Sequence, residues 1–273
     1  YVSQLKYAAA GGEVLAQFDA SYDASGHRRT LSIGPTGESF TYDYTPAYGL
    51  SREVRTRDGA TTDTRYTYDR VGNRLTRNVA GQGTESYTYN ARYELTQMQH
   101  IGGGATEFGY DANGNTLWKQ FSGTESAPAE RTEYGWDPLN RLTGAVRSVN
   151  GVPTDSASFA YGGASWQVAA QTVGRRLEAG GWSEETRTFG WGYGGELLSE
   201  TIPTIGTRHY VNAGIDDVLW SSDNGAPAKF WLNDANGSVH AITDSIGEVI
   251  ERQRHDAFGN TEVTQPNAAF GNQ

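Results

Sequence analysis

Runs of oxygen-bearing side chains are the first candidates for chemistry in this 273-residue chain. Residues 111–115, which read Asp-Ala-Asn-Gly-Asn, resemble the opening of a calcium-binding loop. An EF-hand requires glycine after the third ligand and glutamate at the twelfth position, and here those residues are Thr116 and Ser122. We therefore expect the Asp and Asn side chains to hydrogen-bond their own backbone in a turn, and we predict no metal site and no cofactor.

Two carboxylate pairs, Asp216-Asp217 and Glu184-Glu185, are candidates for the acid and base of a glycosidase. Adjacent residues on a strand point to opposite faces, so neither pair can converge on one substrate bond. The five histidines lack the short spacings of a metal site, and no serine lies in a nucleophile elbow. The absence of cysteine excludes thiolate chemistry. The chain is therefore not expected to be an enzyme.

A phrase that returns along the chain positions these residues. It reads aromatic, any residue, aromatic, Asp or Asn, a Gly/Asn-rich turn, and Leu, with clear copies at 66–75 and 108–117. The second aromatics of the five clear copies, which lie 21, 21, 26 and 55 residues apart, are Tyr68, Tyr89, Tyr110, Trp136 and Trp191. A period in the twenties predicts one supersecondary unit stacked many times.

Each copy has the features of a β-hairpin. Aromatics two residues apart point to one face of a strand, the Asp or Asn accepts backbone hydrogen bonds, and Gly-Asn supplies the reversal. The predicted fold is all-β: repeated antiparallel hairpins with no compact core, in which each unit contacts only its neighbours and the repeat aromatics form ladders. Replacement of Tyr89 by Ala is expected to loosen the adjoining units.

Composition limits the partners. The net charge of −10 disfavours binding to nucleic acid, and no apolar run is long enough to span a membrane. Most of the cations are Arg, which is expected to stack on the aromatics. Trp166 and Trp182 fall outside the clean repeat, so they are the candidate contacts to a cell-surface glycan. Trp136 and Trp191 occupy repeat slots and are expected to pack.

The repeated Tyr-Asp-x-x-Gly-Asn-x-Leu phrase resembles the YD repeat. Residues 209–260, with the phrases Asn-Asp-Ala-Asn-Gly-Ser-Val and His-Asp-Ala-Phe-Gly-Asn, resemble the start of the RHS repeat-associated core. The resemblance implies a β-strip that spirals into a hollow shell. In bacterial members such a shell encloses the protein's own C-terminal toxin or effector, and in animal relatives a similar shell serves cell adhesion. The implied location is secreted or at the bacterial cell surface.

Three segments are predicted: a YD-repeat array over 1–207, the start of the RHS core over 208–263, and a tail over 264–273. The chain begins in mid-pattern and is interpreted as an excerpt of a longer polypeptide. The family's self-cleaving segment is not found, so no self-cleavage residues are assigned. The leading hypothesis is an encapsulating shell segment, whose partners are the effector and the rest of the shell. The alternatives are a surface adhesin or glycan-binding array and, less favoured, a secreted β-rich hydrolase fragment.

Overall fold

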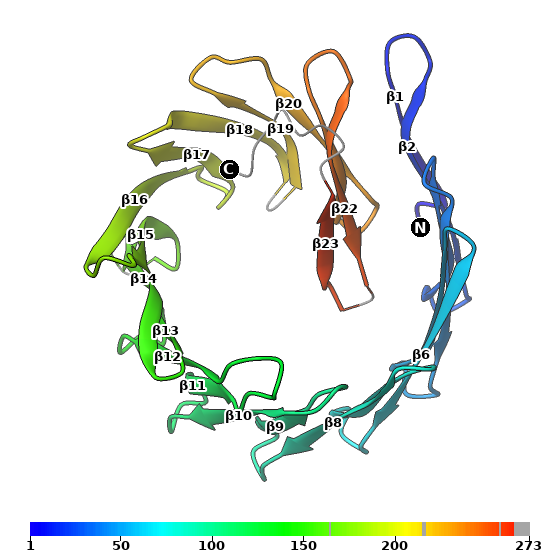
Figure 1. Ribbon diagram of the computed structural model, residues 1–273. Coiled ribbons are helices and arrows are strands. Elements are labelled where there is room, and N and C mark those ends of the chain that lie inside the picture. Colours follow the sequence, from blue (N-terminus) through cyan, green and yellow to red (C-terminus); the bar gives the residue numbers. More distant parts are fainter. Residues whose placement is uncertain (164, 215–216, 257, 265–273) are drawn as a thin grey trace. The chain divides into compact units, whose positions relative to one another are not determined.

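A computed structural model describes residues 1–163, 165–214, 217–256 and 258–264 of the chain (Figure 1). These residues form strands and turns without a helix, as the repeat phrase predicted. No helix in this part of the chain has the length and hydropathy to cross a membrane.

The strands are β1 (Gln4–Ala8), β2 (Val14–Tyr22), β3 (Arg28–Gly34), β4 (Glu38–Tyr44), β5 (Leu50–Arg57), β6 (Ala60–Tyr68), β7 (Arg74–Val79), β8 (Gly83–Tyr89), β9 (Leu95–Gln99), β10 (Ala105–Tyr110), β11 (Thr116–Phe121), β12 (Glu130–Trp136), β13 (Leu142–Val149), β14 (Val152–Tyr161), β15 (Val168–Arg176), β16 (Trp182–Trp191), β17 (Leu197–Ile202), β18 (Gly206–Gly214), β19 (Asp217–Asp223), β20 (Lys229–Asn233), β21 (Val239–Thr243), β22 (Val249–His255) and β23 (Thr261–Thr264).

Five hairpins between β6 and β15 contain a β-bulge at their second aromatic. In the β6–β7 hairpin, Thr67 pairs with Thr76 but Tyr68 pairs with Arg74, which leaves Leu75 as the extra residue. The same shift occurs at Tyr89, at Tyr110, at Trp136 and at Tyr161. A bulge bends the strand and increases its twist. The phrase therefore encodes both a turn and a fixed bend next to it.

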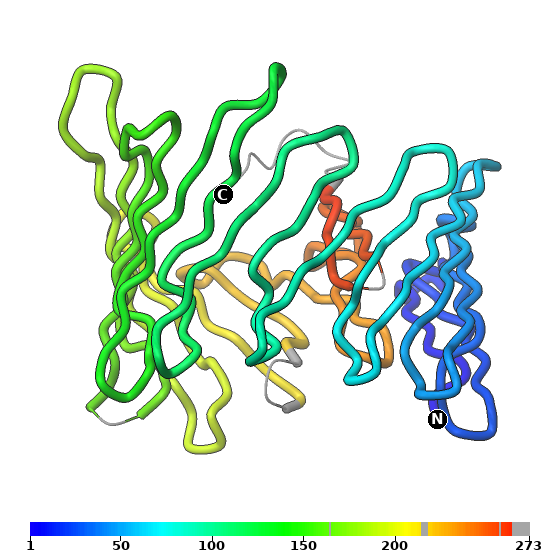
Figure 2. The backbone as a smooth tube through the Cα atoms, turned by 90° about the horizontal axis from the view of Figure 1, so that it is seen from below, coloured from blue at the N-terminus to red at the C-terminus, as the bar shows by residue number. Residues whose placement is uncertain are grey.

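The described residues form two compact units. Unit 2 comprises Thr64–Gly190 and Thr201–Thr204. From β6 to β16 each strand pairs antiparallel with the next one in the sequence (Figure 2). One face buries the first aromatics Tyr66 and Tyr87, whereas the other carries hydroxyl pairs such as Thr67 and Thr76, whose Oγ1 atoms lie 2.6 Å apart.

Arginine side chains cover the aromatic face of unit 2. The Arg74 guanidinium carbon lies 4.5 Å from the Tyr87 ring centroid and 5.9 Å from that of Tyr66. On the opposite face, Arg131 lies 4.7 Å from the Trp118 ring. These distances are within the range of cation–π contacts. The expected stacking of Arg on aromatics is confirmed. The Arg side chains cover aromatic rings that the second sheet of a β-sandwich would otherwise cover.

Unit 1 comprises Tyr1–Asp63, Trp191–Glu200 and Ile205–Gln273. Its strands β1–β5 form one run of antiparallel neighbours, and β18–β23 form another. A hydrophobic core joins the two runs. It contains Ala16, Phe18, Leu31, Ile33, Phe40 and Tyr42 from β2–β4, with Leu232 from β20 and Ala241 from β21.

This core corrects two expectations. We predicted no compact core and contacts only between neighbouring repeats, but unit 1 joins segments about two hundred residues apart. The Tyr7 hydroxyl donates to the backbone oxygen of Asn233 at 3.0 Å, a separation of 226 residues in the sequence. The prediction failed because the period describes neighbouring hairpins and contains no information on contacts between distant ones.

The predicted boundary after residue 207 lies inside β18. The division of the chain into a YD-repeat array and the start of an RHS core stays a prediction. Thr264, the first residue of the predicted tail, ends β23. Residues 265–273 of that tail lie outside the described residues.

Replacing the buried Phe18 with Ala tests the long-range core. We expect Phe18→Ala to lower the free energy of unfolding by about 3–5 kcal/mol, as is usual for a buried aromatic. Amide hydrogen exchange should accelerate in β2–β4 and also in β20–β21, because both runs share the core. Phe230→Ala in β20, where the side chain is 40% exposed, is the control and should cost much less. Acceleration confined to β2–β4 would contradict the shared core.

Candidate functional site

The most repeated local structure is a five-residue turn that begins with Asp or Asn. In the turn at Asp111, Oδ1 accepts the backbone amides of Asn113 and Asn115, both at 2.8 Å. The same two bonds form in the turns that begin at Asp23, Asp69, Asn90, Asp137, Asp234, Asp244 and Asp256. The predicted backbone bonding of these side chains is confirmed.

The turn carboxylates are stabilised in their charged form. The side-chain amide of Asn115 and backbone amides of the turn hold the pKa of the Asp111 carboxyl below its ordinary value. Burial acts to raise the pKa of Asp234, but hydrogen bonds from His240 and from the amides of Asn236 and Ser238 lower it overall. Hydrogen bonds donated to a carboxylate stabilise its charged form and therefore lower the pKa of the carboxyl. Among the described residues, no three His, Cys, Asp or Glu side chains are grouped to hold a metal ion.

In four repeats of unit 2, the second aromatic forms a hydrogen bond to the preceding hairpin, which we call a latch. The Tyr110 hydroxyl donates to the backbone oxygen of Leu95 at 2.7 Å, and Leu95 opens the return strand β9 of the hairpin before it. Tyr89 bonds Arg74 at 3.0 Å, and Tyr161 bonds Leu142 at 2.8 Å. Trp136 bonds Thr116 through its indole nitrogen at 2.8 Å. Each acceptor is the first residue of a return strand.

The latch continues in unit 1, where the Tyr44 hydroxyl donates to the backbone oxygen of Arg28 at 2.9 Å. Residues that are not aromatic form it as well. Asn212 donates to the backbone oxygen of Leu197 at 2.7 Å, and Asn233 donates to that of Val218 at 3.3 Å. The search for aromatic slots missed both residues. The signal was their position, because Asn233 stands two residues after Trp231 and directly before the turn residue Asp234. The second slot requires a hydrogen-bond donor, which is a Tyr hydroxyl, a Trp indole nitrogen or an Asn side-chain amide.

The first aromatic is fully buried in two of the five clear copies. Tyr66 and Tyr87 are 4% and 7% exposed, whereas the first-slot residues Phe108, Tyr134 and Phe189 are half-buried. The second-slot residues are also half-buried, and they are Tyr68, Tyr89, Tyr110, Trp136 and Trp191. Sequence reasoning gave most weight to the second slot, and that slot provides the hydrogen bond to the preceding hairpin. That the second-slot rings also form a ladder remains a prediction.

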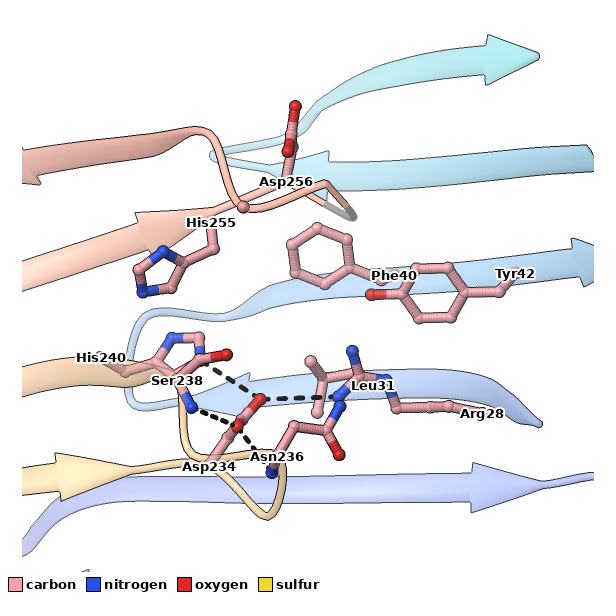
Figure 3. A pocket seen from close by; sticks show the side chains of 11 residues that line it. Arg28, Leu31, Phe40, Tyr42, Asp234, Asn236, Ser238, His240, His255 and Asp256 are labelled. Atoms are coloured by element: carbon pink, nitrogen blue, oxygen red, sulfur yellow. Dashed lines mark hydrogen bonds and ion pairs between the residues drawn. The ribbon is translucent and has the colours of Figure 1, made fainter. Parts of the chain in front are cut away.

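Unit 1 contains a cavity of about 180 Å³ beside its core (Figure 3). Asp234 Oδ2 lies 3.5 Å from Arg28 Nη1 and 3.5 Å from His240 Nε2. The ring centroids of His240 in β21 and His255 in β22 are 5.3 Å apart. His255 is engaged at both nitrogens, by Val239 O at 2.6 Å and Thr261 Oγ1 at 2.9 Å. The cluster is therefore tied into the fold by hydrogen bonds and ion pairs.

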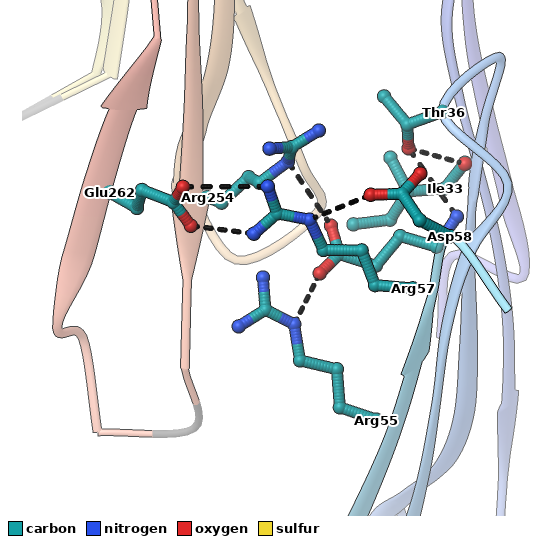
Figure 4. Close-up of polar contacts among 8 residues, drawn as sticks. Ile33, Thr36, Arg55, Arg57, Asp58, Arg254 and Glu262 are labelled. Carbon is teal, nitrogen blue, oxygen red and sulfur yellow. Dashed lines mark hydrogen bonds and ion pairs between the residues drawn. The ribbon is translucent and has the colours of Figure 1, made fainter. Parts of the chain in front are cut away.

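A cluster of charged side chains lies between the two strand runs of unit 1, β1–β5 and β18–β23 (Figure 4). Glu38, which is 2% exposed, pairs with Arg55 of β5, and its other oxygen lies 3.9 Å from Arg254 Nε of β22. Arg57 and Glu262 pair at 2.7 Å. A buried carboxylate requires such partners, since desolvation alone would disfavour its charge. These pairs fix which strands of β18–β23 lie against β4 and β5.

The remaining candidates do not converge. Glu184 and Glu185 occupy successive positions of β16, opposite Gly174 and Val173, so they face opposite sides of the sheet. Asp216 lies outside the described residues. Trp166 is 67% exposed before β15, and Trp182 is 41% exposed at the start of β16, beside the end of β15. A nine-residue strand separates them by roughly 30 Å, so one sugar ring cannot contact both.

No family model matches the chain. The tRNA3(Ser)-specific nuclease WapA of Bacillus spizizenii is 27% identical over 205 residues, and the tRNA nuclease WapA of Bacillus subtilis is 27% identical over 201. Each alignment covers 73% of this chain, and the chain spans about 8% of the length of these curated relatives.

Solved structures also match most of the chain. The TcdB2-TccC3-Cdc42 crystal structure matches 97% of this chain and 17% of its own, at 14% identity and a TM-score of 0.43. The Photorhabdus luminescens Tc holotoxin pore matches 97% of this chain and 17% of its own, at 13% identity and a TM-score of 0.42.

The repeated turn, bulge and latch define an all-β hairpin-repeat protein. The YD phrase and the similarity to the curated WapA relatives are consistent with an RHS/YD-repeat fragment.

The turn carboxylates predict acid sensitivity. The folded-state pKa values of Asp111 and Asp234 are lowered, so their contribution to stability is present above the unfolded value of about 3.9 and is lost as pH falls through the folded values. The urea midpoint should therefore fall in acid. Asp234→Asn, which keeps an acceptor oxygen but cannot titrate there, should flatten this dependence. Asp58→Asn is the control, since that side chain is 74% exposed; equal slopes for both variants would contradict the assignment.

The latch predicts a difference between ring and hydroxyl. Tyr110→Phe removes the bond to Leu95 and keeps the ring, so the free energy of unfolding should fall by about 0.5–1.5 kcal/mol. Hydrogen exchange should accelerate at the β9–β10 junction. Tyr193→Phe, at a fully exposed position, should change neither quantity. Unchanged stability and exchange in Tyr110→Phe would mean that the latch does not hold the hairpins together.

Proposed function

We propose that this chain is a wall segment of a longer polypeptide, and that the wall encloses the polypeptide's own C-terminal effector until delivery. The observation that carries the proposal is the repetition of turn, bulge and latch, which bonds each hairpin to the preceding one along a single layer. Such a layer separates two spaces, whereas a catalytic domain concentrates reactive groups in one cleft. The segment is proposed to have no catalytic activity of its own.

The curated relatives support this assignment. Both are named as tRNA nucleases, and both are much longer than the segment that matches this chain. We infer that the repeats serve a toxin-bearing protein in which the active domain lies elsewhere. A secreted or cell-surface location, in a bacterium, follows from the same proposal.

Protease protection in the full-length polypeptide tests the proposal. The C-terminal region should resist digestion while the wall is folded. Asp111→Ala with Asp137→Ala removes two turn acceptors and should open the wall, so the C-terminal region should be cut at a higher rate. The matched control, Asp111→Asn with Asp137→Asn, keeps the acceptor that Asn90 supplies in its own turn and should retain protection.

Hydrogen exchange measured on the same samples decides the outcome. Rapid cutting of the C-terminal region in the unmodified polypeptide, while β6–β16 remain protected, would show that the wall does not enclose an effector.

A further inference from the structure

Four arginines gather between the two strand runs of unit 1. They come from two similar phrases, Arg-Thr-Arg at 55–57 in β5 and Arg-Gln-Arg at 252–254 in β22. The first phrase begins opposite the core residue Phe40, and the second begins opposite the core residue Ala241. Residues two apart on a strand share a face, so all four side chains lie on the face that carries the core. This arginine cluster consists of Arg55, Arg57, Arg252 and Arg254, and Figure 4 shows three of its members between the runs.

The cluster has fewer carboxylates than guanidinium groups. Glu38 is shared between the runs, because Arg55 bonds one of its oxygens and Arg254 lies 3.9 Å from the other. Glu262 pairs with Arg57 at 2.7 Å. These two acids are therefore divided among at least three arginines, and each brings β5 and the β22–β23 hairpin together.

The other nearby carboxylates leave an excess of positive charge. Asp58 contacts the cluster at 3.3 Å, but its side chain is 74% exposed and water screens its charge. Glu53 lies in the next cross-strand row of β5, opposite Tyr42. Even with Glu53 counted, four guanidinium groups face three carboxylates. In line with this excess, burial and the charge of Arg254 lower the pKa of Arg252 below its ordinary value.

Two N–H groups of the cluster are buried without an acceptor. Neither Arg55 Nη2 nor Arg254 Nε has a hydrogen-bond partner among the described residues. The 3.9 Å between Arg254 Nε and Glu38 Oε2 is an ion-pair distance and is too long for a hydrogen bond. Buried donors nearly always have a partner, because an unpaired one is costly. Unpaired donors and excess positive charge at one place indicate a position suited to an anionic acceptor.

The chemistry of the cluster favours a small tetrahedral oxyanion. A guanidinium group presents its N–H donors in a rigid fork that matches the oxygens of phosphate or carboxylate. Here the donors come from strands of both runs, and an ion with oxygens in four directions can accept from both. The Arg55 and Arg254 side chains are 23% and 18% exposed, so an opening of this kind favours a small ion over a large ligand.

We propose that the arginine cluster binds one oxyanion of the phosphate or sulfate type, which bridges β5 and β22. The ion accepts hydrogen bonds from Arg55 and Arg254 and offsets the repulsion among the guanidinium groups. Because the two strands belong to different runs, the bound ion ties the N-terminal run of unit 1 to its C-terminal run. The joining of these runs then depends on the anion as well as on the apolar core. The inference concerns unit 1 alone and does not depend on a cargo.

Calorimetric titration of the 273-residue chain with inorganic phosphate tests the site. One ion should bind per chain. The urea midpoint should rise with phosphate concentration above its value in sodium chloride of equal ionic strength, because a ligand that binds only the folded state stabilises it. Hydrogen exchange should slow in both β5 and β22. Sulfate should act in the same way, whereas acetate, with one charge and two oxygens, should bind more weakly.

Three variants separate a site from general screening of charge. Arg252→Gln should weaken phosphate binding by about tenfold or more, because a unit charge near the ion is lost. It should leave the chain no less stable in chloride, since repulsion with Arg254 is relieved. Glu262→Gln removes a competing carboxylate and should tighten phosphate binding, a gain that misfolding cannot imitate. Arg70→Gln, at an exposed turn position of unit 2, is the matched control and should change neither quantity.

Several results would overturn the proposal. Equal urea midpoints in phosphate and chloride would show that no ion is bound. Binding of several ions per chain, or equal phosphate responses of Arg252→Gln and Arg70→Gln, would show screening without a site. Acetate bound as tightly as phosphate would contradict the assignment to a tetrahedral oxyanion.

Discussion

An antiparallel sheet one layer thick has backbone bonds between strands but no facing layer to hold its side chains. The interaction on which the rest depends is the latch from the second slot of one hairpin to the return strand of the one before it. The bulge at that slot places the donor, and the Asp or Asn turn fixes the loop that follows. Tyr110 and Leu95 show the arrangement in unit 2. Because the latch acts between neighbours, it can be repeated without limit.

Burial in such a sheet comes from side chains that lie along it. Tyr66 and Tyr87 are buried in a single layer because Arg74 spreads over both rings. Arginine suits this role, since its planar head stacks on an aromatic while its nitrogens remain available for hydrogen bonds. A sheet covered by arginine and aromatics remains polar on its surface.

Unit 1 uses a different solution. Its two runs of strands bury Phe18, Leu31 and Leu232 in a common core and align through polar contacts such as Arg28–Asp234 and Arg57–Glu262. The apolar core provides most of the driving force, because the hydrophobic free energy of folding grows with the apolar area removed from water. The charged pairs provide register, since a misplaced buried carboxylate such as Glu38 would lose its partners.

The sequence by itself determined what depends on neighbouring residues. The aromatic spacing, the acceptor at Asp111 and the left-handed glycines specify hairpins, turns and an all-β fold, since each acts over a few residues. It did not reveal the latch by Asn233, because the slot requires a donor and the search was for rings. Only the tertiary structure decided that His240 lies beside His255 and that Tyr7 reaches Asn233. Those contacts depend on how distant hairpins meet, and a repeat period carries no record of that.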